Sequence, residues 1–341
     1  MKNRLKGIPS VLNTDIYLTR LVGLLVIWMI FMALFQFDRF YTVISFQTMA
    51  AQFPEFGLMA LGVMLCMITG GIDLSVVGVA NLTSITVAFL IKEMAVATGV
   101  LSLSGIIIAL VAGVIIGAIC GVFNGFLVSK IKIPPILATL GSFELFTGIA
   151  IVFTGGRAVS GLPIQYAETM AGRLFGIIPM QLISFLVVAV VLYFLISRTT
   201  YGTKIYMLGT NRQAARFSGL KIDRLLIKTY MLSGICAAVG GLTMLANYNT
   251  ARADFGLVYT LQCVLIVVLG GVTPTGGKGR LGGVILAGCV LQMLSSGLNR
   301  IQQINSFLIP LIWGGVLVLV MVLNYFTENK KVKVKSPGGQ T

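Results

Sequence analysis

Long apolar runs recur along the whole sequence, separated by short polar breaks, and they constrain the fold more than any other feature. A helix that crosses a bilayer needs about 20 mostly apolar residues. The sequence therefore predicts an all-α, polytopic membrane protein with about ten transmembrane helices. The eighth and ninth runs are short and interrupted by glycine, as half-helices are. The ten runs are 18–36, 43–69, 76–91, 103–129, 134–154, 179–197, 227–247, 258–271, 282–298 and 306–326.

The composition agrees with a chain that lies in lipid. Charged residues make up 10% of the sequence and apolar residues 57%, whereas a soluble domain has roughly a quarter of its residues charged. Basic residues precede the first run, as in a signal peptide, but no cleavage site follows, so we expect an uncleaved first span. We expect one domain over 1–341, with a membrane part at 18–326, a cytoplasmic segment at 1–17 and a basic cytoplasmic tail at 327–341.

The net charge of +15 comes from residues concentrated in alternate loops. If ten spans are threaded from a cytoplasmic start, 19 of the 25 Lys and Arg residues lie in cytoplasmic segments. This is the positive-inside bias of a correct topology, and it places both termini in the cytoplasm. The high charge therefore requires no nucleic-acid partner.

Motifs for metal binding and catalysis are missing from the sequence. There is no histidine, and the five cysteines lie in apolar runs without a C-x-x-C pair, so we expect neither a metal site nor a disulfide framework. The G-x-G-x-x-G pattern at 277–282 lies between membrane runs and not in a strand–helix unit. A phosphate loop in the same region fails on spacing, and Gly279 stands where Ser or Thr is required. We expect a protein that is not an enzyme and binds no ATP itself.

Polar residues inside the apolar runs are candidates for function, because they are costly at membrane depth. The stretch TGGIDLS at 69–75 would break a helix, and two interpretations stay open: a cytoplasmic turn, or a gate element in a translocation path. We expect Glu144 to face the protein interior or water. The neutral candidates could line a path for a polyhydroxylated solute or bond between helices. The candidate pathway residues are Asp73, Ser75, Asn81, Thr83, Asn124, Glu144, Gln262 and Gln292.

Four glycines recur every fourth residue in the fourth run, at Gly113, Gly117, Gly121 and Gly125. Small residues at this spacing let helix backbones approach closely in lipid. We interpret them as a packing face in preference to a pore lining.

The loop at about 198–228 holds seven basic residues and one acid. Asn211 can cap a short helix over 213–217 that Gly219 ends. From composition alone, such a helix could lie on the membrane surface or dock in the groove of a partner.

Five stretches, in this order, are similar to one family: TGGIDLS (69–75), FNGFLVSKIKIPPILATLG (123–141), FTGG (153–156), YGTKIYMLGTNRQAARFSGLKID (201–223) and VLGGVTPTGGKGRLGG (268–283). They resemble permease subunits of the ribose-, xylose- and autoinducer-type bacterial ABC importers, which are related to branched-chain amino acid permeases. The resemblance covers about 45–325. It implies a multi-pass inner-membrane permease for a sugar-like solute, working by alternating access.

The resemblance also implies partners. These are a cytoplasmic ATPase that binds the ATP and Mg²⁺, a second identical or paralogous permease, and a periplasmic solute-binding protein that docks chiefly on 155–178. The loop at 209–222 would then present a coupling helix to the ATPase. The residues assigned to coupling are Gly209, Asn211, Arg212, Ala214, Ala215, Arg216, Ser218 and Gly219, with the two arginines reaching rim groups of the ATPase.

The sequence departs from the family pattern at three places: the extra Val77, Thr260 and Gln262 in place of an acidic pair, and Glu144. These departures leave the solute and the identity of the second permease open. The alternative function is an ion-coupled secondary transporter. It would need buried carboxylates, for which the sequence offers only Asp73 and Glu144 as candidates.

Overall fold

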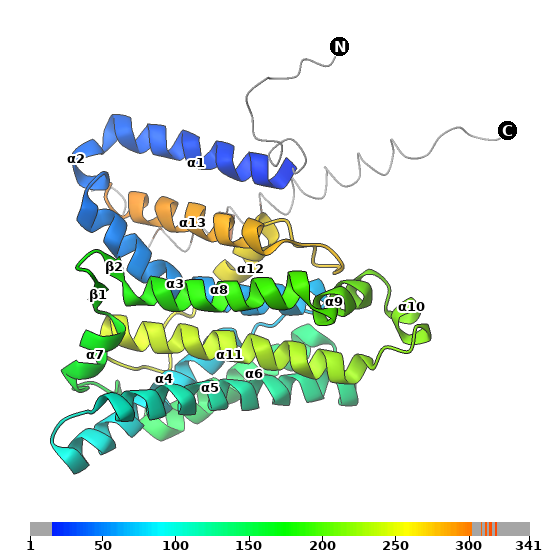
Figure 1. Cartoon of the computed structure of the whole chain (residues 1–341), viewed down its shortest axis with the longest axis horizontal. Helices are drawn as coiled ribbons and strands as arrows, with labels where there is room; N and C mark the ends of the chain where they lie inside the picture. The colour runs from blue at the N-terminus through cyan, green and yellow to red at the C-terminus, as the bar shows by residue number, and fades with distance from the viewer. Residues whose placement is uncertain (1–15, 302–307, 309–310, 312–313, 316–317, 319–341) are drawn as a thin grey trace.

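The computed structural model describes residues 16–301 and, beyond them, 308, 311, 314, 315 and 318 (Figure 1). The tail at 327–341, most of the tenth apolar run and most of the segment at 1–17 lie outside the described residues.

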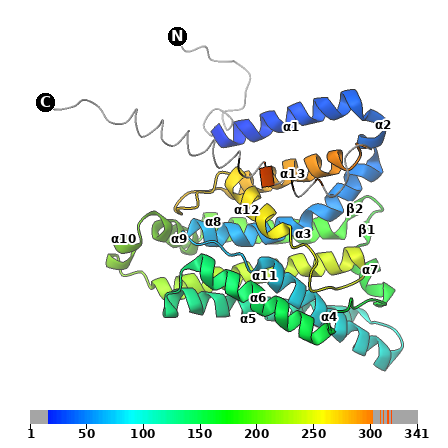
Figure 2. The same cartoon turned by 180° about the vertical axis from the view of Figure 1, so that it is seen from behind.

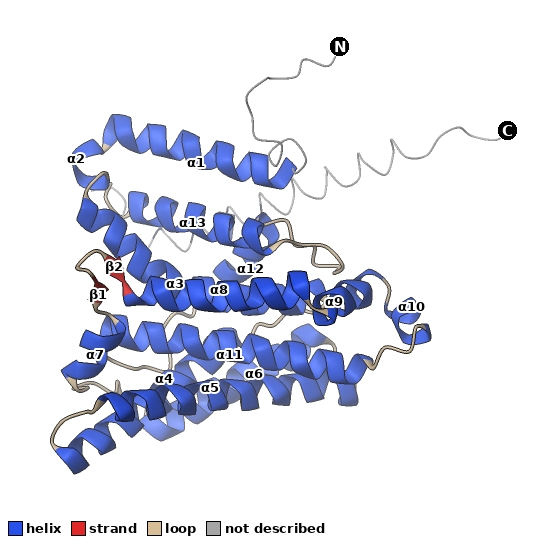
Figure 3. Ribbon diagram, viewed as in Figure 1, coloured by secondary structure: helices blue, strands red, loops and turns tan. Residues whose placement is uncertain are grey.

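The described chain consists of helices joined by loops, with one pair of two-residue strands (Figure 3). The strands pair antiparallel, with Arg173 opposite Pro179. The elements are α1 (Ile16–Phe35), α2 (Phe37–Phe40), α3 (Val43–Ile68), α4 (Val76–Thr98), α5 (Leu103–Phe126), a π-helical turn (Leu127–Ile131), α6 (Pro135–Thr154), α7 (Ile164–Met170), β1 (Arg173–Leu174), β2 (Ile178–Pro179), α8 (Met180–Arg198), α9 (Thr200–Thr210), α10 (Arg212–Phe217), α11 (Ile222–Tyr248), α12 (Tyr259–Leu269) and α13 (Leu281–Leu298).

The prediction of an all-α polytopic membrane protein is confirmed. Within the described residues, eight helices are long and apolar enough to cross a membrane, and α12 is a shorter apolar helix. The first nine predicted runs each correspond to one helix. The half-helix interpretation is wrong for the ninth run, because α13 is one continuous helix of 18 residues.

Helices α3 and α11 form the centre of the bundle. In α3 the continuous stretch from Phe53 to Ile68 is buried, and α11 packs against α3, α4 and α5. Figures 1 and 2 show α1 at the edge of the bundle, beside α13. The bundle thus surrounds its most buried helices with helices that expose large apolar side chains.

The predicted glycine stripe of α5 lies against α11. A methyl group added at Gly117 would overlap Ala238 and the Gly234 carbonyl, and one added at Gly121 would overlap the Tyr230 carbonyl. A methyl group at Gly125 would likewise overlap the Ile227 backbone, and one at Gly113 would press on the end of the Leu242 side chain. The missing side chains let these two helix backbones approach closely.

The two ends of the bundle differ in structure (Figure 1). One end, here called the α7 end, holds α7, the strands and the segment 249–258. Two backbone hydrogen bonds between Val159 and Ala251 join this segment to the loop before α7. The other, here the α10 end, holds α9, α10, the turn at 127–134 and the loop at 270–280.

Candidate functional site

The break between α3 and α4 holds a buried carboxylate. The Oδ1 atom of Asp73 accepts hydrogen bonds from the backbone N–H and the hydroxyl of Ser75, at 3.0 and 2.7 Å. Its Oδ2 accepts one from the Ser233 hydroxyl on α11, at 2.7 Å. Asn124 on α5 donates in turn to the Ser75 hydroxyl, at 2.6 Å. Burial raises the pKa of the Asp73 carboxyl, and the hydrogen bonds from Ser75 and Ser233 oppose that rise.

Neighbouring elements hold the same break from other sides. The Leu74 N–H donates to the Thr139 hydroxyl on α6, at 3.1 Å. At the α10 end, the Gly277 N–H donates to the Ile68 carbonyl, at 2.8 Å. The segment 69–75 is therefore a largely buried bend, held by α5, α6 and α11, and differs from an ordinary exposed turn.

A second buried carboxylate lies nearer the α7 end, on α3. Glu55 is 1% exposed, and its Oε1 accepts a hydrogen bond from the Asn247 amide at 2.6 Å. Its Oε2 accepts hydrogen bonds from the Tyr248 and Tyr259 hydroxyls, at 3.3 and 3.1 Å. The Gln181 amide donates to Asn247 Oδ1 at 2.6 Å, which extends the cluster to α8.

The Glu55 cluster borders a cavity of about 230 Å³. Most of the residues that line it have polar side chains, among them Gln47, Gln52 and Arg173. Gln181 also lines it, and its buried Oε1 has no hydrogen-bond partner among the described residues. This arrangement of carboxylate, amide and phenol groups can bind hydroxyl groups or water.

The structure corrects the assignment of buried carboxylates. Glu144 is exposed on the outer face of α6, so of the two expected settings, protein interior or water, it does not lie in the interior of this chain. Asp73 and Glu55 are the buried acids among the described residues. Glu55 is not among the residues predicted from the sequence, although a lone acid within the apolar run 43–69 was a usable signal.

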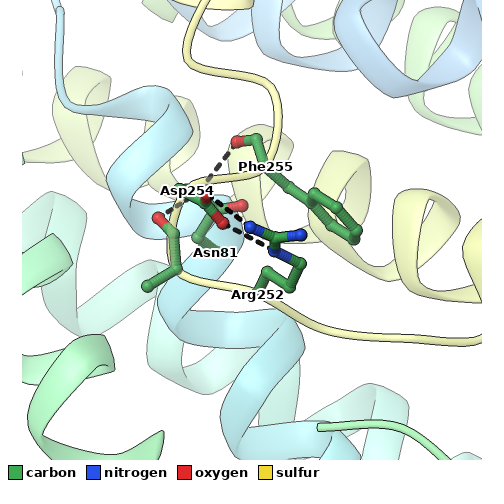
Figure 4. A network of polar contacts seen from close by, with 5 residues as sticks. Asn81, Arg252, Asp254 and Phe255 are labelled. Atoms are coloured by element: carbon green, nitrogen blue, oxygen red, sulfur yellow. Dashed lines mark hydrogen bonds and ion pairs between the residues drawn. The ribbon is translucent and has the colours of Figure 1, made fainter. Parts of the chain in front are cut away.

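Asn81 on α4 forms hydrogen bonds to the loop at 249–258, at the α7 end (Figure 4). Its amide donates to the carbonyls of Ala253 and Phe255, at 2.9 Å each. In the same loop, Arg252 pairs with Asp254 at 2.7 Å and lies over the ring of Phe255. Hydrogen bonding to Arg252 lowers the pKa of the Asp254 carboxyl. Asn81 therefore holds the 249–258 loop against α4.

The predicted pathway residues do not form one site. Asp73, Ser75 and Asn124 share a cluster, whereas Gln292 bonds to Gln52 at 3.2 Å in another part of the bundle. Thr83 and Gln262 are buried, and the Thr83 hydroxyl has no hydrogen-bond partner among the described residues.

Helix α10 begins and ends close to where the sequence predicts. Asn211 is the N-cap, its Oδ1 accepting a hydrogen bond from the Ala214 N–H at 3.0 Å. After Ser218, Gly219 ends the helix with φ +76°, a conformation that glycine adopts readily. The helix lies at one extreme of the molecule in Figures 1 and 2.

The side chains of α10 divide into three groups. Ala215 is buried, while Ala214 and Ser218 line a hollow against α9. Arg212 and Arg216 line a different hollow, toward the 127–134 turn. Phe217 is 92% exposed, which makes it the most exposed large apolar side chain among the described residues.

Gly209 lies inside the chain, where an added methyl group would overlap the Ile68 carbonyl and the backbone at 276–277. The small residues of this region thus fit α9 and α10 onto the bundle, and Phe217 is the side chain that projects from it. Sequence reasoning did not single out Phe217.

Comparison with known proteins gives consistent matches over most of the chain. Residues 45–324 match the family described as "Branched-chain amino acid transport system / permease component". The ribose import permease of Bacillus subtilis (strain 168) is 34% identical over 270 residues, which is 78% of this chain and 80% of the relative.

Two further relatives come from other bacteria. The D-allose transport system permease of Escherichia coli (strain K12) is 28% identical, over 78% of this chain and 79% of its own. The autoinducer 2 import system permease of Yersinia pestis is 31% identical, over 76% of this chain and 72% of its own. No solved structure gives a significant match.

Proposed function

The chain belongs to the branched-chain amino acid transport system permease family, and from this premise we propose that it is the membrane subunit of an ATP-driven bacterial importer for a sugar or sugar-like solute. It is a multi-pass inner-membrane transport permease, not an enzyme in itself. The named relatives carry ribose, allose and autoinducer 2. A sugar-like solute is the chemistry that these names share.

The observation that carries the proposal is the form of α10. A capped short helix at one extreme of the bundle presents a nearly fully exposed aromatic ring. Exposed aromatic side chains are the usual anchors of protein interfaces. Phe217 would seat in the cleft of a separate ATPase subunit, which holds ATP and Mg²⁺, and closure of the ATPase would move the helices between two access states.

Charges and surfaces support an orientation for this assembly. The basic residues of the 127–134 turn, of α10 and of the 270–280 loop lie at the α10 end, which would be cytoplasmic. The α7 end would face the periplasm and receive a solute-binding protein at 155–178, where Phe175 is 87% exposed. The outer face of α6 around Glu144 would pack on a second permease, because a carboxylate facing lipid is costly.

The two exposed phenylalanines allow a matched test. We expect Phe217→Ala to abolish co-purification of the ATPase and to reduce uptake at least tenfold, since an interface anchor contributes roughly 2 kcal/mol or more. Phe175→Ala should still co-purify with the ATPase, but the binding protein should no longer stimulate its uptake of solute. Co-purification from native membranes, identification by mass spectrometry and uptake in whole cells give these results. Full ATPase association and uptake in Phe217→Ala would refute the coupling assignment.

A further inference from the structure

A large hollow separates α10 from the turn that joins α5 to α6. Its volume is about 780 Å³. Six cationic side chains line it, together with a single acid, Asp223. We name it the basic groove, and its cations are Lys130, Lys132, Arg212, Arg216, Lys221 and Arg224.

Most of this charge is not neutralised. Lys130 pairs with Asp223 at 3.0 Å. The other five cations have no carboxylate partner among the described residues. Five like charges around one hollow repel one another and attract an anion.

A buried hydroxyl gives an independent indication of a ligand. Ser129 lines the basic groove and is 2% exposed. Its Oγ has no hydrogen-bond partner within the described part of the chain. A buried polar group without a partner is costly, and a bound acceptor would satisfy it.

The groove lies at the level where a membrane-crossing segment ends. The apolar segment Leu103–Ile131 ends beside it, and Ile222–Tyr248 begins beside it. A second hollow of about 310 Å³ shares Lys132, Arg212 and Arg216 with the groove, and its other walls are apolar. These walls are Val128, Ile133, Pro134 and Pro135.

The nearby helix surface is apolar and open. Ile131, Ile136 and Leu137 are between 48% and 62% exposed. Cations that lie directly above exposed apolar surface match an amphiphile with an anionic head and acyl chains. Such basic pockets at helix ends are suited to anionic lipid headgroups.

We propose that the basic groove binds the phosphate headgroup of an anionic membrane lipid, whose acyl chains lie along the exposed apolar surface around Ile131 and Ile136. Phosphate oxygens accept hydrogen bonds from the lysine and arginine groups and from Ser129. The lipid links the membrane boundary to Arg212 and Arg216 of α10, and so holds that helix in place. This site is additional to the proposed ATPase contact.

The test measures lipid binding directly, so its failure is distinct from a failure of the proposed import function. The full chain is purified in mild detergent and titrated with cardiolipin, phosphatidylglycerol or phosphatidylcholine, and bound lipid is counted by native mass spectrometry. The groove variant carries Lys132→Gln, Lys221→Gln and Arg224→Gln. A matched control removes three cations that lie at the α10 end but outside the groove, by Arg198→Gln, Lys204→Gln and Lys278→Gln. Thermal unfolding in detergent checks that both variants fold.

We expect wild type and control to prefer the anionic lipids. The groove variant should bind them tenfold to about a hundredfold more weakly, at a few-fold per cation. Ser129→Ala should weaken the same binding by a few-fold without changing the charge. An equal loss in groove and control variants would show general charge attraction and overturn the proposal. Displacement of lipid by millimolar inorganic phosphate would assign the groove to a soluble anion. Loss of lipid binding when the ATPase alone is added would assign the groove to an acidic partner.

Discussion

Two carboxylates are buried in this bundle, and their surroundings differ. Asp73 lies in the break between helices and accepts hydrogen bonds from Ser75 and Ser233 at 2.7 to 3.0 Å. Glu55 lies within α3, accepts hydrogen bonds from an amide and two phenols, and borders a cavity of about 230 Å³. Both acids are 1% exposed, so exposure alone does not distinguish them.

The difference lies in what could replace a lost hydrogen bond. Asp73 lines none of the hollows described above, whereas Glu55 lines the cavity of about 230 Å³. Water in the cavity beside Glu55 could bond to a group that loses its partner, at little cost in free energy. The Asp73 cluster is thus suited to fixing the bend at 69–75, and the Glu55 cluster to exchanging partners with a solute.

Removing the carboxylate of Asp73 should have the largest effect. In Asp73→Leu, the Ser75 N–H and the hydroxyls of Ser75 and Ser233 lose their acceptor in a closed environment. We expect a loss of about 3 kcal/mol or more in the free energy of unfolding, with poor recovery from the membrane. Unfolding in detergent, followed by circular dichroism, measures it. A loss below about 1 kcal/mol would show that the cluster does not fix the bend.

Asp73→Asn is the matched control, because asparagine resembles the protonated acid. Burial raises the pKa of Asp73, so the folded state binds the carboxyl proton more tightly than the unfolded state does. The stability of the wild type should therefore decrease as the pH rises from about 3.9, the ordinary value, to the raised pKa. The asparagine variant should lack this decrease, so its stability should be closest to that of the wild type at acid pH.

Removing the carboxylate of Glu55 should have a smaller effect. In Glu55→Leu, Asn247, Tyr248 and Tyr259 lose an acceptor, but water in the cavity can replace it. We expect a loss of about 1–2 kcal/mol on unfolding. Glu55→Gln, which keeps the shape and one acceptor, should be milder. A loss as large as that of Asp73→Leu would contradict the distinction between a closed and an open cluster.

The sequence predicts the helices well and the partners of buried polar groups poorly. Nine apolar runs correspond to helices because length and hydropathy are local properties, and Asn211 and Gly219 bound α10 because caps are local too. Glu55 and Asn247 meet across 192 residues, which no local pattern encodes. For Glu144 the sequence left interior and water both open, because α6 is apolar around most of its surface and its sequence does not indicate which face is buried.

The loop that Asn81 holds offers a weaker test of the α7 end. In Asn81→Leu, the carbonyls of Ala253 and Phe255 lose their donor, at a cost of about 1 kcal/mol. We expect faster proteolysis within 249–258 and little change in global unfolding. Asp254→Asn should increase cleavage less, because its ion pair is exposed. Since Arg252 lowers the pKa of Asp254, the contribution of that pair is present above the ordinary pKa and disappears as the pH falls through the lowered value. Unchanged cleavage in Asn81→Leu would show that the loop is held by other contacts.

Glu144 is an exposed acid within the membrane-spanning helix α6, and it should matter least to the isolated chain. It is exposed on α6, on the same face as Gly141 and Gly148. A methyl group added at either glycine would have open space within 4 Å. We expect Glu144→Leu to change the unfolding of the monomer by no more than about 0.5 kcal/mol. Because a carboxylate facing lipid is costly, the same substitution should alter how two permeases associate. Crosslinking between α6 cysteines at Gly141 or Gly148 in native membranes measures that association. Unchanged crosslinking, with an unchanged monomer, would mean that Glu144 faces a water-filled path and not the second permease.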